Sequence, residues 1–274
     1  MLARAPNVPK GCAIVLVHVL NPYGMAWLRR ANENNVDLNR NFLSPGETWK
    51  GAPPLYSRLD PLLNPPTPPG ADRFWWRLAA MALRHGPRRL KQAIAEGQYE
   101  FPRGLFFGGR ALEPGARLYL DFLRRNLARA EYLFAIDMHT GLGPRGGETL
   151  VLEAGARATP ASELARALDR NLIDLAAGDA AYRIRGGMGS ALSTALPGAR
   201  TDFLLEEIGT YPAHTVLAAL REENRCHHHD SGLAHSAKRA LLEAFAPSSP
   251  RWRRHAVEKS TQLLNAAAAW TFDR

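Results

Sequence analysis

Cysteine is scarce in this sequence of 274 residues. The two cysteines, Cys12 and Cys226, lie far apart, and neither is part of a CxxC pattern. A disulfide scaffold and a zinc site built from several cysteines are therefore excluded. A domain of this length buries roughly three quarters of its unfolded surface and needs no such supports. We expect one domain over residues 1–274, opening with an irregular segment over residues 1–11.

Long apolar runs are also lacking. The longest one, CAIVLVHVL over Cys12–Leu20, is shorter than the roughly 20 residues that span a bilayer. The preceding segment carries Arg4, Lys10 and prolines where a signal peptide has an apolar centre. We therefore expect a cytoplasmic protein with no membrane partner.

Acidic residues are outnumbered by basic ones. Lys and Arg total 35, whereas Asp and Glu total 26, which gives a formal net charge of +9. Such an excess permits contact with nucleic acid. Because no aromatic-basic motif or zinc-finger spacing accompanies the charge, we expect a solvated basic surface and no specific nucleic-acid partner.

Apolar patterning alternates between strands and helices along the chain. Runs rich in Val, Ile and Leu predict strands over 12–20, 132–137, 149–153 and 203–208. Helical spacing predicts helices near 25–30, 72–100 (with a second helix beginning after Gly86-Pro87), 114–130, 161–176, 236–245 and 251–269. Residues 61–70 read as a proline-rich connector and residues 184–200 as a flexible loop. The order predicts an α/β fold with a mostly parallel or mixed central sheet and helices on both faces.

Three polar motifs, NPYG, DMHTG and EEIGT, each follow or end a predicted strand. Active sites of α/β sheets gather at the carboxyl ends of strands. We therefore treat the three motifs as one candidate site.

The first motif opens the string NPYGMAWLRRANENNVDLNRNF over Asn21–Phe42. Arginine can bind a carboxylate through two nitrogens at once, and a neighbouring Asn can orient it. The string resembles the zinc carboxypeptidase family, in which an NPxG turn is followed by an Arg and then by DLNRNF. The resemblance implies that Asn39 and Arg40 hold the terminal carboxylate of the substrate, and that Arg30 polarises the scissile carbonyl.

The second motif places Asp137 and His139 on one face of a strand. By the same resemblance His139 is the third ligand of a zinc cofactor, and DMHTGLG looks like the version found in an uncharacterised bacterial branch of the family, a domain of unknown function. A ligating imidazole usually needs an acceptor on its second nitrogen. Asp137 either supplies that acceptor or caps the strand end, and both interpretations stay open.

The third motif contains Glu206 and Glu207, which point to opposite faces if they lie on a strand. The resemblance implies that Glu207 is the general base, which takes a proton from water and passes it to the leaving amine. Glu206 is interpreted as a solvated or salt-bridged surface residue.

One part of the resembled pattern has no counterpart. In that family the first two zinc ligands come from a His-x-x-Glu motif upstream of the NPxG turn, and the segment before Asn21 contains only His18, which we expect to be a hydrogen-bonded core histidine. A misassigned start, a truncated gene or a metal-free relative would each explain the gap. We expect the chain as given to hold no catalytic zinc, and the Cys12–Leu20 strand to lack a neighbour.

Two further clusters could be mistaken for sites. The histidines His227–His229 are interpreted as a surface or site-rim cluster that binds metal only adventitiously. The glycine run Gly186–Gly189 lacks the pattern of a phosphate loop.

The resemblance as a whole implies a metallocarboxypeptidase-like hydrolase of an amide bond next to a free carboxylate, impaired in this chain, whose partner is a small peptide or an acyl-amino acid. The alternatives are a catalytically dead carboxylate-binding protein of the same fold and, third, a basic nucleic-acid binder.

Overall fold

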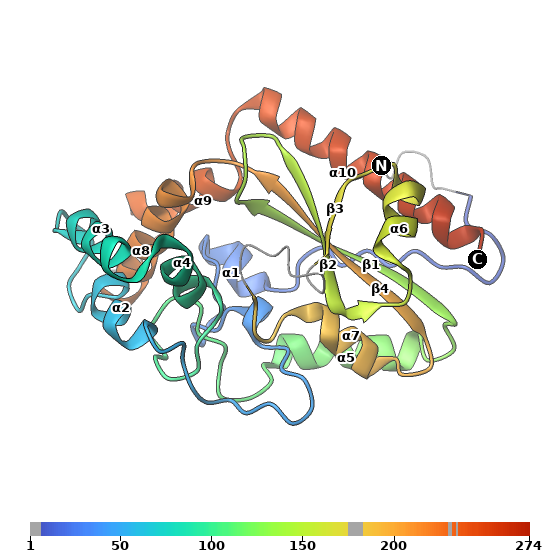
Figure 1. Ribbon diagram of the computed structural model, residues 1–274, viewed down its shortest axis with the longest axis horizontal. Helices are drawn as coiled ribbons and strands as arrows, with labels where there is room; N and C mark the ends of the chain where they lie inside the picture. Colours follow the sequence, from blue (N-terminus) through green and yellow to red (C-terminus); the bar gives the residue numbers. More distant parts are fainter. Residues whose placement is uncertain (1–6, 175–182, 230–231, 234) are drawn as a thin grey trace.

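A four-stranded mixed sheet forms the centre of the computed structural model, which describes residues 7–174, 183–229, 232–233 and 235–274 (Figure 1). The strands are β1 (Tyr132–Gly141), β2 (Glu148–Arg157), β3 (Leu172–Asp174) and β4 (Arg200–Gly209). Their order across the sheet is β1-β4-β2-β3. β1 pairs with β4 and β2 with β3 in parallel, whereas β2 runs antiparallel to β4. The expected mixed α/β architecture is confirmed.

The helices are α1 (Pro22–Trp27), the 3₁₀ turn η1 (Leu38–Arg40), α2 (Tyr56–Leu63), α3 (Phe74–His85), α4 (Pro87–Ala95), α5 (Pro114–Asn126), α6 (Ala161–Leu168), α7 (Met188–Ala195), α8 (Ala213–His229), α9 (Ser236–Phe245) and α10 (Pro250–Phe272). No helix in the described part of the chain is both long and apolar enough to cross a bilayer.

The two faces of the sheet carry separate cores, because successive strand residues point to opposite sides. Phe203 and Leu205 of β4 pack against α5 and α7 on one face. Leu204 of β4 and Leu150 and Leu152 of β2 pack against α6 and α10 on the other face. Helices therefore cover both faces, as the apolar patterning predicts.

A third core lies beside the sheet, in the helical group at the left of Figure 1. Side chains of α2, α4, α8 and α9 form it, with Tyr56, Leu59 and Leu63 fully buried at its centre. α2 extends into the first residues of the connector expected over 61–70, so that prediction is wrong over Pro61–Leu63. Pro61 removes one backbone N–H donor inside this helix, and the burial of Leu59, Leu62 and Leu63 stabilises the helix in spite of that loss.

The strand predicted over Cys12–Leu20 is wrong, and so is the core position predicted for His18. This run has no strand pairing in the structure, and Ile14, Val15, Leu16 and Val17 are exposed. His18 is exposed as well. A β-branched run becomes a strand only where cross-strand partners and burial stabilise it. Only the end of the run, at Leu20, packs against the cores near α5 and Phe107.

Two other predicted segments also differ from the structure. The expected flexible loop over 184–200 contains helix α7, whose buried Leu192 packs against the sheet. The helix expected over 161–176 ends at Leu168, because Asp169 adopts a left-handed conformation and the chain turns into β3. The last two residues of that prediction lie outside the described residues.

A pair of carboxylates lies buried on the α10 side of the sheet. Glu206 of β4 is fully buried, not solvated as expected, and its Oε2 accepts a hydrogen bond of 2.8 Å from Ser260. Glu148 of β2 accepts one of 3.2 Å from Arg170. The Oε1 atoms of both glutamates are buried without a hydrogen-bond partner. Burial, together with the charge of the neighbouring Glu148, raises the pKa of Glu206 to about 7.

This pair should make the stability of the fold depend on pH. Folding raises the pKa of Glu206 from 4.5 to about 7, so the folded chain holds the proton more tightly than the unfolded chain. Stability therefore falls as pH rises through that window, by on the order of 2 kcal/mol. Glu206→Gln should flatten the dependence and be more stable than the parent protein above pH 7, as measured by urea unfolding at a series of pH values.

Glu33→Gln is the matched control, because Glu33 is exposed and its carboxylate lies outside the pair. The control should keep the pH dependence of the parent. An unchanged pH dependence in Glu206→Gln would contradict the assignment of the titrating pair.

Candidate active site

The parallel register of β1 and β4 brings the second and third motifs together. His139 lies directly opposite Glu207, and Asp137 lies opposite Leu205. Residues paired in this way point to the same face of the sheet, so Asp137, His139 and Glu207 share the face covered by α5 and α7. The strand-end grouping predicted from sequence is therefore confirmed for these two motifs, although β1 extends past His139 to Gly141.

His139 is held by the carboxylate two residues before it. Its Nε2 lies 2.7 Å from Oδ2 of Asp137. Burial by itself would lower the pKa of His139, but the charge and hydrogen bond of Asp137 outweigh it, and the pKa is raised. With Nε2 donating to Asp137, the lone pair of the neutral imidazole is on Nδ1. Asp137 thus orients the imidazole, which is one of the two interpretations left open by the sequence.

Glu207 is fixed by the loop that follows β1. Its Oε1 accepts a hydrogen bond of 2.9 Å from the backbone N–H of Leu142. Burial raises the pKa of Glu207, and the charge of His139 opposes that rise. A carboxylate with a raised pKa beside a basic imidazole is an arrangement suited to proton transfer.

The first motif supplies the cationic part of the site. Asn21 caps α1 by accepting from Gly24, and its side-chain amide donates to the carbonyl of Arg30, 3.1 Å away. Arg30 Nε in turn donates to Oδ2 of Asp37 at 2.8 Å. Burial would raise the pKa of Asp37, but the positive charges of Arg30 and Arg40 hold it below its usual value.

Arg30 is close to the second and third motifs as well. Its positive charge contributes to the pKa values of both His139 and Glu207. About a quarter of its side chain (26%) is accessible, whereas the side chain of its partner Asp37 is 5% accessible. Arg30 is therefore the cation of this site that a ligand can reach.

Arg40 is deeply buried. The residue is 2% exposed, and its guanidinium donates to the backbone carbonyls of Ala95 and Asn39. Gly97 lies against it with φ +108°, and a Cβ there would come within 2.6 Å of Arg40 Cδ. Asn39 is only partly buried. The structure thus places Asn39 and Arg40 side by side, but Arg40 lies under the surface and acts through its charge.

Phe106 joins the two arginines, and no sequence signal pointed to it. The guanidinium carbons of Arg30 and Arg40 lie 5.4 and 5.5 Å from the centroid of its ring. Its φ is +57°, in the left-handed region that a bulky residue rarely adopts. Such backbone conformations persist where surrounding structure enforces them, and they cluster at functional sites.

Glu153 is a second residue that the sequence reasoning missed. Burial and the charge of Asp137 raise its pKa to about 7, while Arg40 and His139 counteract the rise. The glycine run explains how a carboxylate fits there. A Cβ on Gly189 would lie 2.2 Å from Glu153 Oε2, and one on Gly187 would lie 3.0 Å from Oε1. Because these glycines have no Cβ, the Glu153 carboxylate can lie against the start of α7.

The residues do not form a zinc site as the structure places them. Within the described residues, no group of three or more His, Cys, Asp or Glu side chains is arranged to hold a metal ion. His139 offers one nitrogen, and Asp137 and Glu207 are engaged by hydrogen bonds to His139 and Leu142. The donor set therefore does not fit the zinc cofactor that the resemblance implies.

The histidine cluster lies on a different element, at the end of α8. His227 and His228 are partly buried, and His229 is exposed. Burial and the charges of Arg29 and Arg103 lower the pKa of His227 to about 3 and that of His228 to about 4. Both imidazoles are neutral at physiological pH.

A family model described as "Protein of unknown function (DUF2817)" matches residues 1–259. The chain belongs to this family. No curated protein and no solved structure matches the chain. The DUF2817 description names no reaction, so the chemistry is argued from the site itself.

The hydrogen bond between Asp137 and His139 can be tested by titration. Asp137→Asn removes the charge that raises the pKa of His139 and leaves burial, which lowers it. We expect the pKa of His139 to fall, as followed by NMR of the imidazole protons. Glu207→Gln, which removes a smaller contribution, should lower the pKa less, and the reverse order would contradict the assignment.

Proposed function

We propose that this protein binds a small peptide or an acyl-amino acid through its free carboxylate, in a site of the carboxypeptidase type. The observation that carries the proposal is the accessible guanidinium of Arg30, held by Asp37 beside His139 and Glu207. Asn39, which the resemblance assigns to the same substrate, is partly exposed. The resemblance of NPYG and DLNRNF to the zinc carboxypeptidases supports the same ligand.

The distribution of charge favours a carboxylate on the arginine side. Arg30 and Arg40 flank Phe106, and both lower the pKa of the buried Asp37, so the guanidinium groups of the site lie in this half. The opposite half contains Asp137, Glu153 and Glu207, which would repel an anion. A ligand with a carboxylate at one end and a neutral amide at the other matches both halves.

Binding should be visible as thermal protection. N-acetyl amino acids should raise the melting temperature, and their C-terminal amides should not, because a charge-assisted hydrogen bond contributes about 1.5–3 kcal/mol. Arg30→Gln and Asn39→Ala should each reduce the protection. Arg40→Ala is a poor test, because the buried guanidinium also supports the fold.

Arg88→Gln is the matched control, since it removes an exposed arginine from α4, away from the motif. It should keep the full protection of the parent protein. Equal protection by acids and amides, or equal protection of the parent and Arg30→Gln, would refute the carboxylate site.

A second candidate function is hydrolysis of the amide bond next to that carboxylate. The observation that favours it is Glu207, whose carboxylate has a raised pKa and lies opposite His139. In this role Glu207 would accept a proton from water and donate it to the departing amine nitrogen. Arg30 would stabilise the negative charge on the carbonyl oxygen. No step is assigned to zinc, because the described residues do not form its ligand set.

We expect this chain to bind its ligand without turnover. The purified protein should contain less than one equivalent of zinc by elemental analysis, and it should release no amino acid from an N-acetyl amino acid. Glu207→Gln should retain the thermal protection. Stoichiometric zinc that is lost in His139→Ala, together with turnover that is lost in Glu207→Gln, would show instead that the chain is a complete hydrolase.

A further inference from the structure

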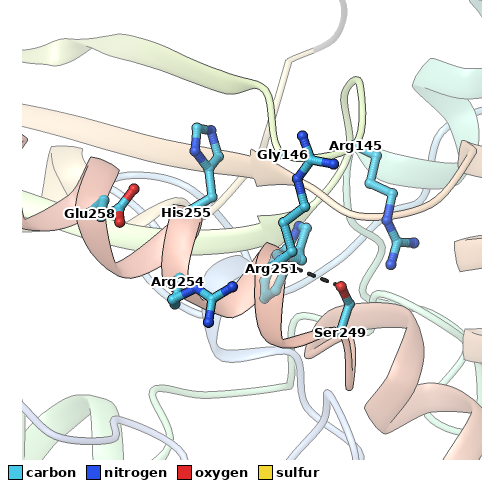
Figure 2. A pocket seen from close by; sticks show the side chains of 8 residues that line it. Arg145, Gly146, Ser249, Arg251, Arg254, His255 and Glu258 are labelled. Carbon is cyan, nitrogen blue, oxygen red and sulfur yellow. Dashed lines mark hydrogen bonds between the residues drawn. The ribbon is translucent and has the colours of Figure 1, made fainter.

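A basic cleft lies where the start of α10 meets the β1–β2 loop (Figure 2). Its volume is about 490 Å³. Its lining side chains are mostly cationic or polar. They are Arg145, Ser249, Arg251, Trp252, Arg254, His255 and Glu258, together with Gly146. In Figure 2, Arg251 and Arg254 extend from the first turns of α10, and Arg145 comes from the loop beside them.

The floor of the cleft is fixed to the end of the sheet. The buried indole of Trp252 donates to the carbonyl of Gly209, 2.8 Å away. The same carbonyl accepts from Gly146 N–H at 2.8 Å, and Gly209 N–H donates to Gly147 at 2.9 Å. Gly146 has φ +74°, and a Cβ there would lie 3.4 Å from His255. These hydrogen bonds fix the β1–β2 loop and the start of α10 to the same end of β4. The cleft between them is therefore formed in the absence of a ligand.

The cleft has an excess of positive charge. Among the described residues, none of Arg145, Arg251 and Arg254 lies within 4.0 Å of a carboxylate oxygen. Arg145 stacks on Tyr211, with its guanidinium carbon 4.5 Å from the ring centroid. Glu258 is the one acidic residue in the lining.

We propose that this cleft binds a small molecule that carries a phosphate or diphosphate group. Guanidinium groups match phosphate oxygens in pairs of parallel hydrogen bonds, and three arginines line this cleft. The volume lies within the range of about 300–1,000 Å³ that small-molecule sites occupy.

This site is separate from the carboxylate site. Its cations come from α10 and the β1–β2 loop, whereas Arg30 and Arg40 come from the segment before α2. The proposal therefore stands independently of the proposed function, and each can fail without the other.

The test is calorimetric titration of the full chain with inorganic pyrophosphate at physiological ionic strength. We expect saturable binding with one site per chain. The double variant Arg251→Gln/Arg254→Gln should bind about tenfold more weakly or worse, because it removes two of the three phosphate-binding side chains. Circular dichroism checks that the variant is folded.

Arg253→Gln is the matched control. It also replaces an arginine of α10 by glutamine, but Arg253 is not among the residues that line the cleft, and its Nε donates to the carbonyl of Pro247. It should bind like the parent protein. Equal weakening in Arg253→Gln, undiminished binding in the double variant, or no saturable binding by the parent would overturn the proposal. Binding of a short DNA duplex that pyrophosphate cannot displace would assign the surface to nucleic acid and would overturn it as well.

Discussion

The in-register parallel pairing of β1 with β4 is the constraint on which the candidate site depends. It sets His139 opposite Glu207 and assigns the two adjacent glutamates to opposite faces of the sheet. A slip of one residue would exchange the faces of Glu206 and Glu207. Glu206 would then lose Ser260, and the apolar residues Leu204 and Leu205 would leave their cores. The hydrophobic pattern that fixes the register therefore also fixes the chemistry.

The site combines two halves that come from different parts of the chain. The segment over Asn21–Phe42 is held together by its own polar side chains, chiefly Asn21, Asp37 and Arg40, and supplies the cations. The sheet supplies the acids and the imidazole. Phe106 contacts both arginines, and Gly187 and Gly189 lie against Glu153. Burial then moves the pKa values of Glu153 and Glu207 toward neutrality.

The sequence predicts the fold class and much of the site because both depend on local patterns. Short apolar runs predict β1 and β4, and the motifs around His139 and Glu207 mark their ends. The prediction of secondary structure and burial fails where contacts between distant parts of the chain determine them. Cys12–Leu20 has the composition of a strand, but in the structure no ladder pairs with it. Phe106 and Glu153 carry no motif, and their role follows from which side chains surround them.

The depth of Arg40 illustrates the same limit. A motif indicates that an arginine is present, but only the packing of Gly97 and the carbonyl of Ala95 shows that its guanidinium is covered. Glu206 is the converse case. As one of two adjacent acids it reads as a surface residue, yet α10 and Ser260 cover it. In both cases the deciding partner lies more than fifty positions away in the chain.

The short loop between β1 and β2 is anchored at both of its ends. Leu142 holds Glu207, and Gly146 and Gly147 hold Gly209. The loop must therefore span the distance between two sets of hydrogen bonds, one at the candidate active site and one at the floor of the basic cleft. An inserted or deleted residue in this loop would misplace one anchor whenever the other is satisfied. The number of residues in this loop is therefore constrained at both ends. Insertions and deletions should be better tolerated in connections that form such hydrogen bonds at one end only.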